Sequence, residues 1–292
     1  MEPVPGPFRA DEAVAGGRIT RGRLAGPTTT RLFPNVHALT DHVPTTLAER
    51  ARAAVLYVRD EAPVVGGFAA ADLLGASCGP RDAPVELVVG ARRVRARPGL
   101  VIREDVLGPD DVVDVDGVPV TSAERTAWDL ARRLRLDDAV VTVDALARVG
   151  RFPPAVLLDR PAGRRGVTGL ADVVAASDPR SESPPETRMR LIMARRGLPA
   201  PILQYEVFDE GGLFVARVDF GWKDVRVAGE YQGDHHRTDR AQWRRDQRRT
   251  AELAACDWVA VPWTGDDLVA PRGFLQRLAA TLERRGPATR ST

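Results

Sequence analysis

Several residue types are scarce in this 292-residue chain, and each shortage excludes a class of protein. The two cysteines, Cys78 and Cys256, lie far apart and in no metal-ligand spacing, which argues against a disulfide framework or a zinc ribbon and favours a reducing compartment. No apolar run approaches the roughly 18 residues of a membrane-spanning helix. The first residues also lack a basic segment followed by an apolar one, the pattern of a secretion signal. We therefore expect a cytoplasmic protein without a membrane partner.

Lysine is almost absent, because Lys223 is the only one and arginine supplies nearly all of the positive charge. The formal net charge is only +2, so no overall polycation is implied. Arginine together with many alanine, glycine and proline residues is also the product of a GC-rich genome. Because genome composition can account for the arginine content, basic composition alone does not indicate nucleic-acid binding.

The chain has the composition of a soluble globular protein, with 43% hydrophobic and 28% charged residues. Its length predicts about two domains, and the pattern of segments predicts an α/β (α+β) fold. We divide the chain into an N-terminal arm or reduced winged-helix remnant, an α/β domain, a linker and a C-terminal domain, at residues 1–44, 45–176, 177–183 and 184–292.

Local patterns in the first half predict elements but no catalytic cluster. One or two short helices are expected between Asp11 and Leu24, and a strand at residues 31–39. Thr121 followed by Glu124 is a capping-box pattern, which predicts a helix from there to about Leu134.

The C-terminal domain begins with a strong helix start, Ser183 at the N-cap, Pro184 at the first helical position and Glu186 at the third. This helix is expected to end at Gly197. Apolar periodicity then predicts the order α-β-β-β-α-β-α, and a mixed sheet flanked by helices is its natural packing.

Polar groups at the ends of two of these strands suggest a metal site. Asp219 ends one strand, and Glu230 and Gln232 share one face of the next. A hard cation such as Mg²⁺ (or Mn²⁺) prefers oxygen ligands of this kind. Asp219 and Glu230 can meet only if the turn between the strands is centred near Asp224, or if a bulge corrects the register.

Each of these residues also has a structural explanation. Asp219 could accept a turn hydrogen bond, Glu230 could pair with an arginine, and the capping box alone could account for Glu186. If Glu186 is functional, we expect it to support the metal or its water.

An arginine-rich stretch follows the second strand. His236, preferred over His235, could act as an acid, a base or a phosphate contact. Basic side chains on and before the next helix could bind a nucleic-acid backbone, with a solvated helix face as the alternative; they are Arg237, Arg240, Arg244, Arg245 and Arg248.

Two stretches of sequence resemble known families. The phrases SPPETRMRLIMARRGLP, RVDFGW, EYQGDHHR and RRDQRRTAEL resemble an actinobacterial C-terminal domain of unknown function that is related to very short patch repair endonucleases, in the PD-(D/E)XK superfamily. This resemblance implies a restriction-endonuclease-like fold. The family usually has aspartate at the position of Gln232, and the superfamily's frequent lysine is absent here.

The upstream phrases FRADEAVAGGRITRGRLAG, RLFPNVHAL, PVELVV and VPVTSAERTAWDLARR resemble AbiEi-type antitoxins. That resemblance carries no catalytic motif. It implies binding of DNA or of a protein partner by the N-terminal region.

Two functions follow from these patterns. The first is a Mg²⁺-dependent DNA endonuclease with Asp219, Glu230, Gln232, His236 and Glu186 as site residues, the first three binding the metal. The alternative is a non-catalytic DNA-binding or toxin–antitoxin-type regulator that retains the nuclease fold. Clustering of Asp219, Glu230 and Gln232 in an open basic groove would favour the enzyme, whereas a buried arginine bound to Glu230 would favour the regulator. The sequence leaves the oligomeric state open.

Overall fold

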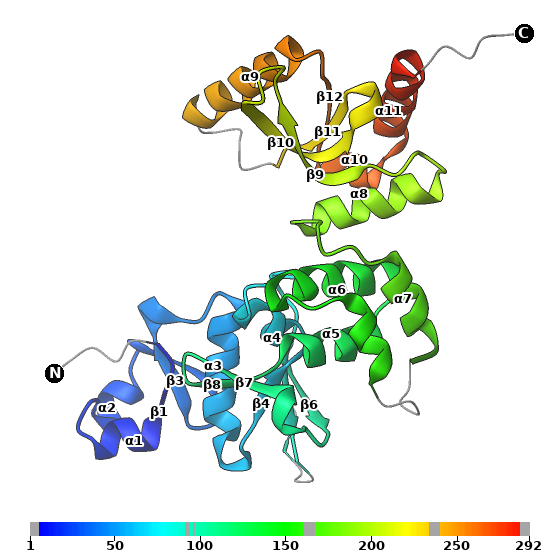
Figure 1. The fold of residues 1–292 in the computed structure, drawn as a ribbon. Coiled ribbons are helices and arrows are strands. Elements are labelled where there is room, and N and C mark those ends of the chain that lie inside the picture. The colour runs from blue at the N-terminus through cyan, green and yellow to red at the C-terminus, as the bar shows by residue number, and fades with distance from the viewer. Residues whose placement is uncertain (1–5, 91–93, 96, 161–166, 234–239, 287–292) are drawn as a thin grey trace, which may run out of the picture. The chain divides into compact units, whose positions relative to one another are not determined.

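The computed structural model describes residues 6–90, 94–95, 97–160, 167–233 and 240–286. The chain divides into two compact units, Met1–Ser177 and Asp178–Thr292. Both units combine helices with sheets (Figure 1), which confirms the α+β class. Within the described residues, no helix is long and apolar enough to cross a membrane.

Unit 1 begins with a small module over residues 8–39, here called the N-terminal module. Its elements are β1 (Phe8–Arg9), α1 (Ala10–Ala15), α2 (Arg21–Leu24), β2 (Thr29–Phe33) and β3 (Val36–Leu39). The strands form an antiparallel sheet in the order β1-β3-β2, and Phe8, Ala13 and Ile19 form its core. The single strand predicted at residues 31–39 is therefore wrong. Asn35 has a positive φ of 62°, a conformation that asparagine tolerates in tight turns, and it turns the chain into a hairpin.

The rest of unit 1 surrounds a five-stranded sheet in the order β6-β5-β4-β8-β7. Its strands are β4 (Val64–Gly66), β5 (Val85–Val89), β6 (Leu100–Glu104), β7 (Val112–Val115) and β8 (Val118–Thr121). Its helices are α3 (Leu47–Val58), α4 (Gly67–Leu73), α5 (Ala123–Ala131), α6 (Leu136–Gly150) and α7 (Leu170–Ala176). Short 3₁₀ segments are η1 (Thr40–His42), η2 (Arg59–Glu61), η3 (Pro109–Asp111), η4 (Pro154–Asp159) and η5 (Val167–Gly169).

Helix α5 begins one residue later than the capping-box pattern predicted. Ser122 is its N-cap, and the Ser122 hydroxyl accepts a hydrogen bond from the Arg125 amide at 3.3 Å. Thr121 instead ends β8, and its hydroxyl lies 2.7 Å from that of Thr126. Both Thr121 and Ser122 can cap a helix. Thr121 belongs to strand β8, so Ser122 caps the helix.

Unit 2 has the predicted order α-β-β-β-α-β-α, with one short extra helix, α10. Its elements are α8 (Pro184–Arg195), β9 (Ile202–Phe208), β10 (Phe214–Trp222), η6 (Lys223–Val225), β11 (Val227–Tyr231), α9 (Arg240–Ala255), β12 (Val259–Trp263), α10 (Gly265–Val269) and α11 (Arg272–Arg285). The sheet order is β12-β11-β10-β9, with β11 and β12 parallel and the other pairs antiparallel.

Helices cover both faces of this sheet (Figure 1). Met189 and Met193 of α8 and Phe274 and Leu278 of α11 share one core, and Leu253 of α9 lies in the core on the other face. The start of α8 is as predicted, with Ser183 at the N-cap and proline in the first turn. The sheet is thus a rigid platform between helices, and the polar groups at its strand ends have fixed positions.

Candidate functional site

Three acidic side chains of unit 2 form what we call the carboxylate cluster: Glu186 of α8, Asp219 of β10 and Glu230 of β11. Phe220 pairs with Gly229 and Trp222 with Val227, and the same register brings Asp219 opposite Glu230. The connection runs through η6 (Lys223–Val225), so the turn is centred near Asp224 and no bulge is needed. The Tyr231 amide donates to Asp219 Oδ2 at 2.7 Å.

Glu186 joins the cluster from the first turn of α8. Its carboxylate accepts hydrogen bonds from the Ser183 hydroxyl at 2.6 Å and the Glu182 amide at 2.9 Å. A capping box would instead use the amide of the N-cap residue Ser183. It also accepts one from Gln204 Nε2 at 2.8 Å. Gln204 has a positive φ of 52°, rare for a side chain of its size. This strained conformation in β9 accompanies a contact with the cluster, as strain often does at functional sites.

Electrostatics link the cluster members. Burial raises the pKa of Asp219, the Tyr231 amide lowers it, and the charge of Glu230 raises it further, so that the pKa lies above its ordinary value. Burial likewise raises the pKa of Glu186, where the hydrogen bond from Ser183 opposes it and the charge of Asp219 adds to it. Carboxylates held together against repulsion are typical of functional sites.

Arg249 of α9 provides the positive charge at this site. Its Nη2 lies 2.9 Å from Glu230 Oε1 and also donates to the Arg217 carbonyl. The side chain of Glu230 is 19% exposed and that of Arg249 is 39% exposed. The expectation for the non-catalytic alternative was a buried arginine on Glu230. Arg249 forms the ion pair, but its side chain is only partly buried.

The remaining predicted site residues lie outside the carboxylate cluster or outside the described residues. The Gln232 side chain is exposed, and its backbone amide donates to the Trp263 carbonyl at 2.7 Å. His235, His236 and Arg237 lie outside the described residues, as do the side chains of Arg240, Arg244 and Arg245 on α9. Arg248 is exposed and pairs with Glu252 at 2.8 Å. The assignment of these residues to a metal or nucleic-acid site stays a prediction.

The donor chemistry of Asp219 and Glu230 fits a magnesium ion, because both offer hard carboxylate oxygens and Mg²⁺ needs only one or two of them while keeping several waters. Within the described ranges, no group of three histidine, cysteine or acidic side chains is arranged to hold a metal ion. The predicted Mg²⁺ or Mn²⁺ site therefore stays a prediction, and it would depend on the two strand carboxylates.

Two members of this site, Gln204 and Arg249, match positions of the C-terminal family pattern, but the sequence gave neither of them a role at the site. Gln204 gave no local signal, since it reaches Glu186 only through its unusual backbone conformation. Arg249 was one arginine among many. A signal existed, however: Leu253, four residues later, is 1% exposed, and residues four apart share a helix face. That spacing turns Arg249 towards the sheet.

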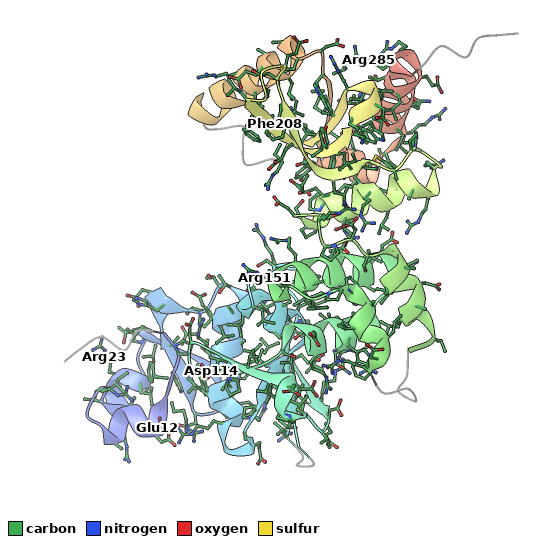
Figure 2. The ribbon with its side chains drawn as sticks, in the orientation of Figure 1. Glu12, Arg23, Asp114, Arg151, Phe208 and Arg285 are labelled. Carbon is green, nitrogen blue, oxygen red and sulfur yellow. The ribbon has the colours of Figure 1, made fainter. Side chains whose placement is uncertain are left out.

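A second candidate site lies on the N-terminal module. Four exposed arginines, here called the N-terminal arginine set, lie on and around α2 and the β2–β3 hairpin: Arg18, Arg21, Arg23 and Arg31. Figure 2 labels Arg23 together with Glu12 of α1. Among the described residues, no guanidinium of this set donates a hydrogen bond or forms an ion pair.

The acidic residues of the module are paired elsewhere. Asp11 and Glu12 both pair with Arg9, at 3.2 and 3.7 Å, and Glu12 also pairs with Arg59. The acids of the module therefore form no ion pair with the set, although the charge of Arg23 acts on Asp41 of η1. Sequence reasoning missed this set because it depends on which charges of the fold pair with each other.

Comparisons with known proteins give one family model and two relatives. Residues 35–176 match the family model of the AbiEi antitoxin C-terminal domain. Two proteins described as uncharacterized, from two strains of Mycobacterium tuberculosis, are each 36% identical over 196 residues, which cover 65% of this chain and 70% of theirs. The chain belongs to the family of these two proteins.

No solved structure matches the chain in these comparisons. The family match ends at residue 176, before unit 2 begins. The resemblance of the C-terminal domain to very short patch repair endonucleases thus stays a prediction.

Proposed function

We propose that the protein is a DNA-binding regulator of the toxin–antitoxin type. The observation that carries this proposal is the N-terminal arginine set, whose four side chains are exposed and unpaired within the described residues while the neighbouring acids Asp11 and Glu12 are paired. The match of residues 35–176 to an antitoxin domain supports it. A protein partner that binds unit 1 is part of the same proposal.

The geometry of the module suits a DNA duplex. Its order β-α-α-β-β is that of a winged helix without its leading helix, and such proteins bring the second helix of a helix-turn-helix to the major groove. Here that helix is α2, whose N-cap Thr20 accepts the Arg23 amide at 3.2 Å. Arg21 and Arg23 extend from α2, and Arg31 from the adjoining hairpin, so helix and hairpin together present arginines to phosphate.

The first prediction concerns salt dependence. Each arginine that contacts a phosphate contributes about 0.9 to the slope of log K against log salt. Arg21→Ala and Arg23→Ala should each reduce that slope by about one and weaken binding. We would measure fluorescence anisotropy of a labelled duplex taken from upstream of the protein's own gene, and of a random duplex of equal length.

Arg148→Ala is the matched control, because Arg148 is an exposed arginine on α6, outside the module. It removes the same charge and should leave the slope unchanged. The proposal is wrong if the wild type binds neither duplex, or if Arg148→Ala weakens binding as much as the α2 variants.

The second candidate function is metal-dependent cleavage of DNA by unit 2. One observation favours it: Glu186, Asp219 and Glu230 converge from three elements, and the pKa of Asp219 is raised by burial and by the neighbouring charge of Glu230. A bound Mg²⁺ would activate water and neutralise charge on the phosphate. Asp219 and Glu230 would hold it, and Glu186 would be held in place by Gln204.

The test of this second function is a nicking assay on supercoiled, linear and single-stranded DNA with Mg²⁺ or Mn²⁺. Asp219→Ala and Glu230→Ala should abolish cleavage, a loss of at least about a hundredfold for groups that act at the reacting centre. Asp224→Ala, an exposed acid in the same hairpin, serves as the control. Absence of cleavage by the wild type on every DNA form would leave the regulator as the only function.

A further inference from the structure

Arg249 lies where a cation bound to Glu230 would lie. Its Nη2 is bound to Glu230 Oε1 at 2.9 Å and to the Arg217 carbonyl of the neighbouring strand. The charge of Arg249 also acts on Asp219: burial raises the pKa of that carboxyl, and Arg249 works in the opposite direction. One guanidinium therefore serves two carboxylates that would otherwise repel each other.

The hydrogen bonding of the Arg249 guanidinium is incomplete. Arg249 Nε is shut off from solvent and has no hydrogen-bond partner in the described part of the chain. A buried donor without an acceptor weakens the contact relative to a fully satisfied arginine. The side chain of Arg249 is also 39% exposed, so it can leave Glu230 without crossing a packed core.

The neighbouring arginine is placed quite differently. Arg248 Nε pairs with Glu252 Oε1 on α9 itself, at 2.8 Å, and its side chain is 82% exposed. Successive residues on a helix point about 100° apart, which explains why one arginine contacts the sheet and the other faces solvent. The chain thus offers a matched pair of arginines, of which only one touches the cluster.

We propose that Arg249 is a built-in cation of the carboxylate cluster and that it competes with a divalent metal ion for Glu230 and Asp219. In the arrangement described here, Arg249 keeps the site closed to metal. An anionic ligand that draws Arg249 away from Glu230, such as a nucleic-acid phosphate, would open it. This inference rests on the second candidate function, in which Asp219 and Glu230 are a cation site.

The experiment measures Mn²⁺ binding to the full chain by the electron paramagnetic resonance of free Mn²⁺, without DNA. Removing one positive charge at contact distance should tighten Mn²⁺ binding by roughly tenfold to a hundredfold in Arg249→Gln. Arg248→Gln, which removes an equal charge one residue away, should bind Mn²⁺ like the wild type. Adding Glu230→Gln to Arg249→Gln should remove the gain.

Folding of each variant is checked by circular dichroism. Arg249→Met is a second variant, because it keeps the aliphatic stem that packs beside the sheet. As an independent readout, Mn²⁺ should raise the melting temperature of both Arg249 variants more than that of the wild type. If folded Arg249→Gln or Arg249→Met binds Mn²⁺ no more tightly than the wild type and Arg248→Gln, the inference is overturned.

The inference and the cleavage function can fail separately. A gain in Mn²⁺ affinity without cleavage by any variant would support the closed cation site and reject the nuclease. Cleavage by the wild type with unchanged Mn²⁺ affinity in the Arg249 variants would support the nuclease and reject the role of Arg249.

Discussion

At the scale of single residues, Asp219 combines a buried position with a negative neighbour. Its pKa is raised above the ordinary value of 3.8 by burial first, against the hydrogen bond from the Tyr231 amide. Because the folded chain then takes up a proton more readily than the unfolded chain, the stability of unit 2 rises as the pH falls through this raised pKa. At neutral pH the ionised carboxyl destabilises the fold.

Asp219→Asn is therefore expected to raise the free energy of unfolding of unit 2 at pH 7. The asparagine oxygen can still accept the Tyr231 amide, whereas the repulsion from Glu230 is removed. The advantage over the wild type should shrink as the pH falls towards 3.8, the ordinary value, because the wild-type carboxyl is then also neutral. Urea unfolding at a series of pH values measures this.

Asp224→Asn is the control for that experiment, since Asp224 is exposed at the turn of the same hairpin. It should leave the pH dependence unchanged. A destabilised Asp219→Asn protein at pH 7, or one whose difference from the wild type does not vary with pH, would contradict the expectation.

At the scale of elements, one buried arginine connects three segments of unit 1. Arg125 of α5 binds Asp105 at 2.6 Å, Asp111 of η3 at 2.9 Å and Asp129 of α5 at 2.7 Å, and its side chain is 4% exposed. Trp128 lies beneath Arg132, whose guanidinium carbon is 4.0 Å from the centre of the ring. Arg125 is the cation that these three carboxylates share, and Asp111 and Asp129 also pair with Arg160 and Arg132.

Arg125→Leu should destabilise unit 1 by up to about 3–5 kcal/mol, because it removes the buried cation that three carboxylates share. Equilibrium unfolding in urea measures the change. Arg148→Leu, on the exposed side of α6, should alter stability by less than about 0.5 kcal/mol. Equal effects of the two substitutions would show that the buried network does not hold these segments together.

Most elements could be predicted from the sequence where a local signal was sufficient. The Ser183–Pro184–Glu186 pattern gave the start of α8, and the predicted order of unit 2 is confirmed. Strand β4 was missed because three residues, Val64–Gly66, give no periodicity. The cap of α5 was assigned one residue early because Thr121 and Ser122 have the same local propensity, and the choice between them depends on the sheet.

At the scale of the whole molecule, the two units contain the candidate sites of different proposed functions. Unit 1 contains the residues that match the antitoxin-domain model and the N-terminal arginine set, and unit 2 contains the carboxylate cluster. The residues predicted as a linker, 177–183, are held by local contacts: Arg180 pairs with Asp178 at 2.6 Å, and Ser181 is 3% exposed. The proposed regulation and the proposed metal chemistry therefore involve separate parts of the chain, and their tests can be run independently.

The sequence alone determined the fold class, the order of elements in unit 2 and the start of α8, because these follow from propensity, periodicity and capping within short stretches. It left the register between Asp219 and Glu230 open, and the folded hairpin fixes it with a turn centred near Asp224. Only the tertiary structure decided which charges meet. Arg249 reaches Glu230 from 19 residues away and Gln204 reaches Glu186 from 18, and the acids of the N-terminal module pair with Arg9 and Arg59 rather than with α2. An ion pair depends on a distance of a few ångströms between groups, and packing sets that distance.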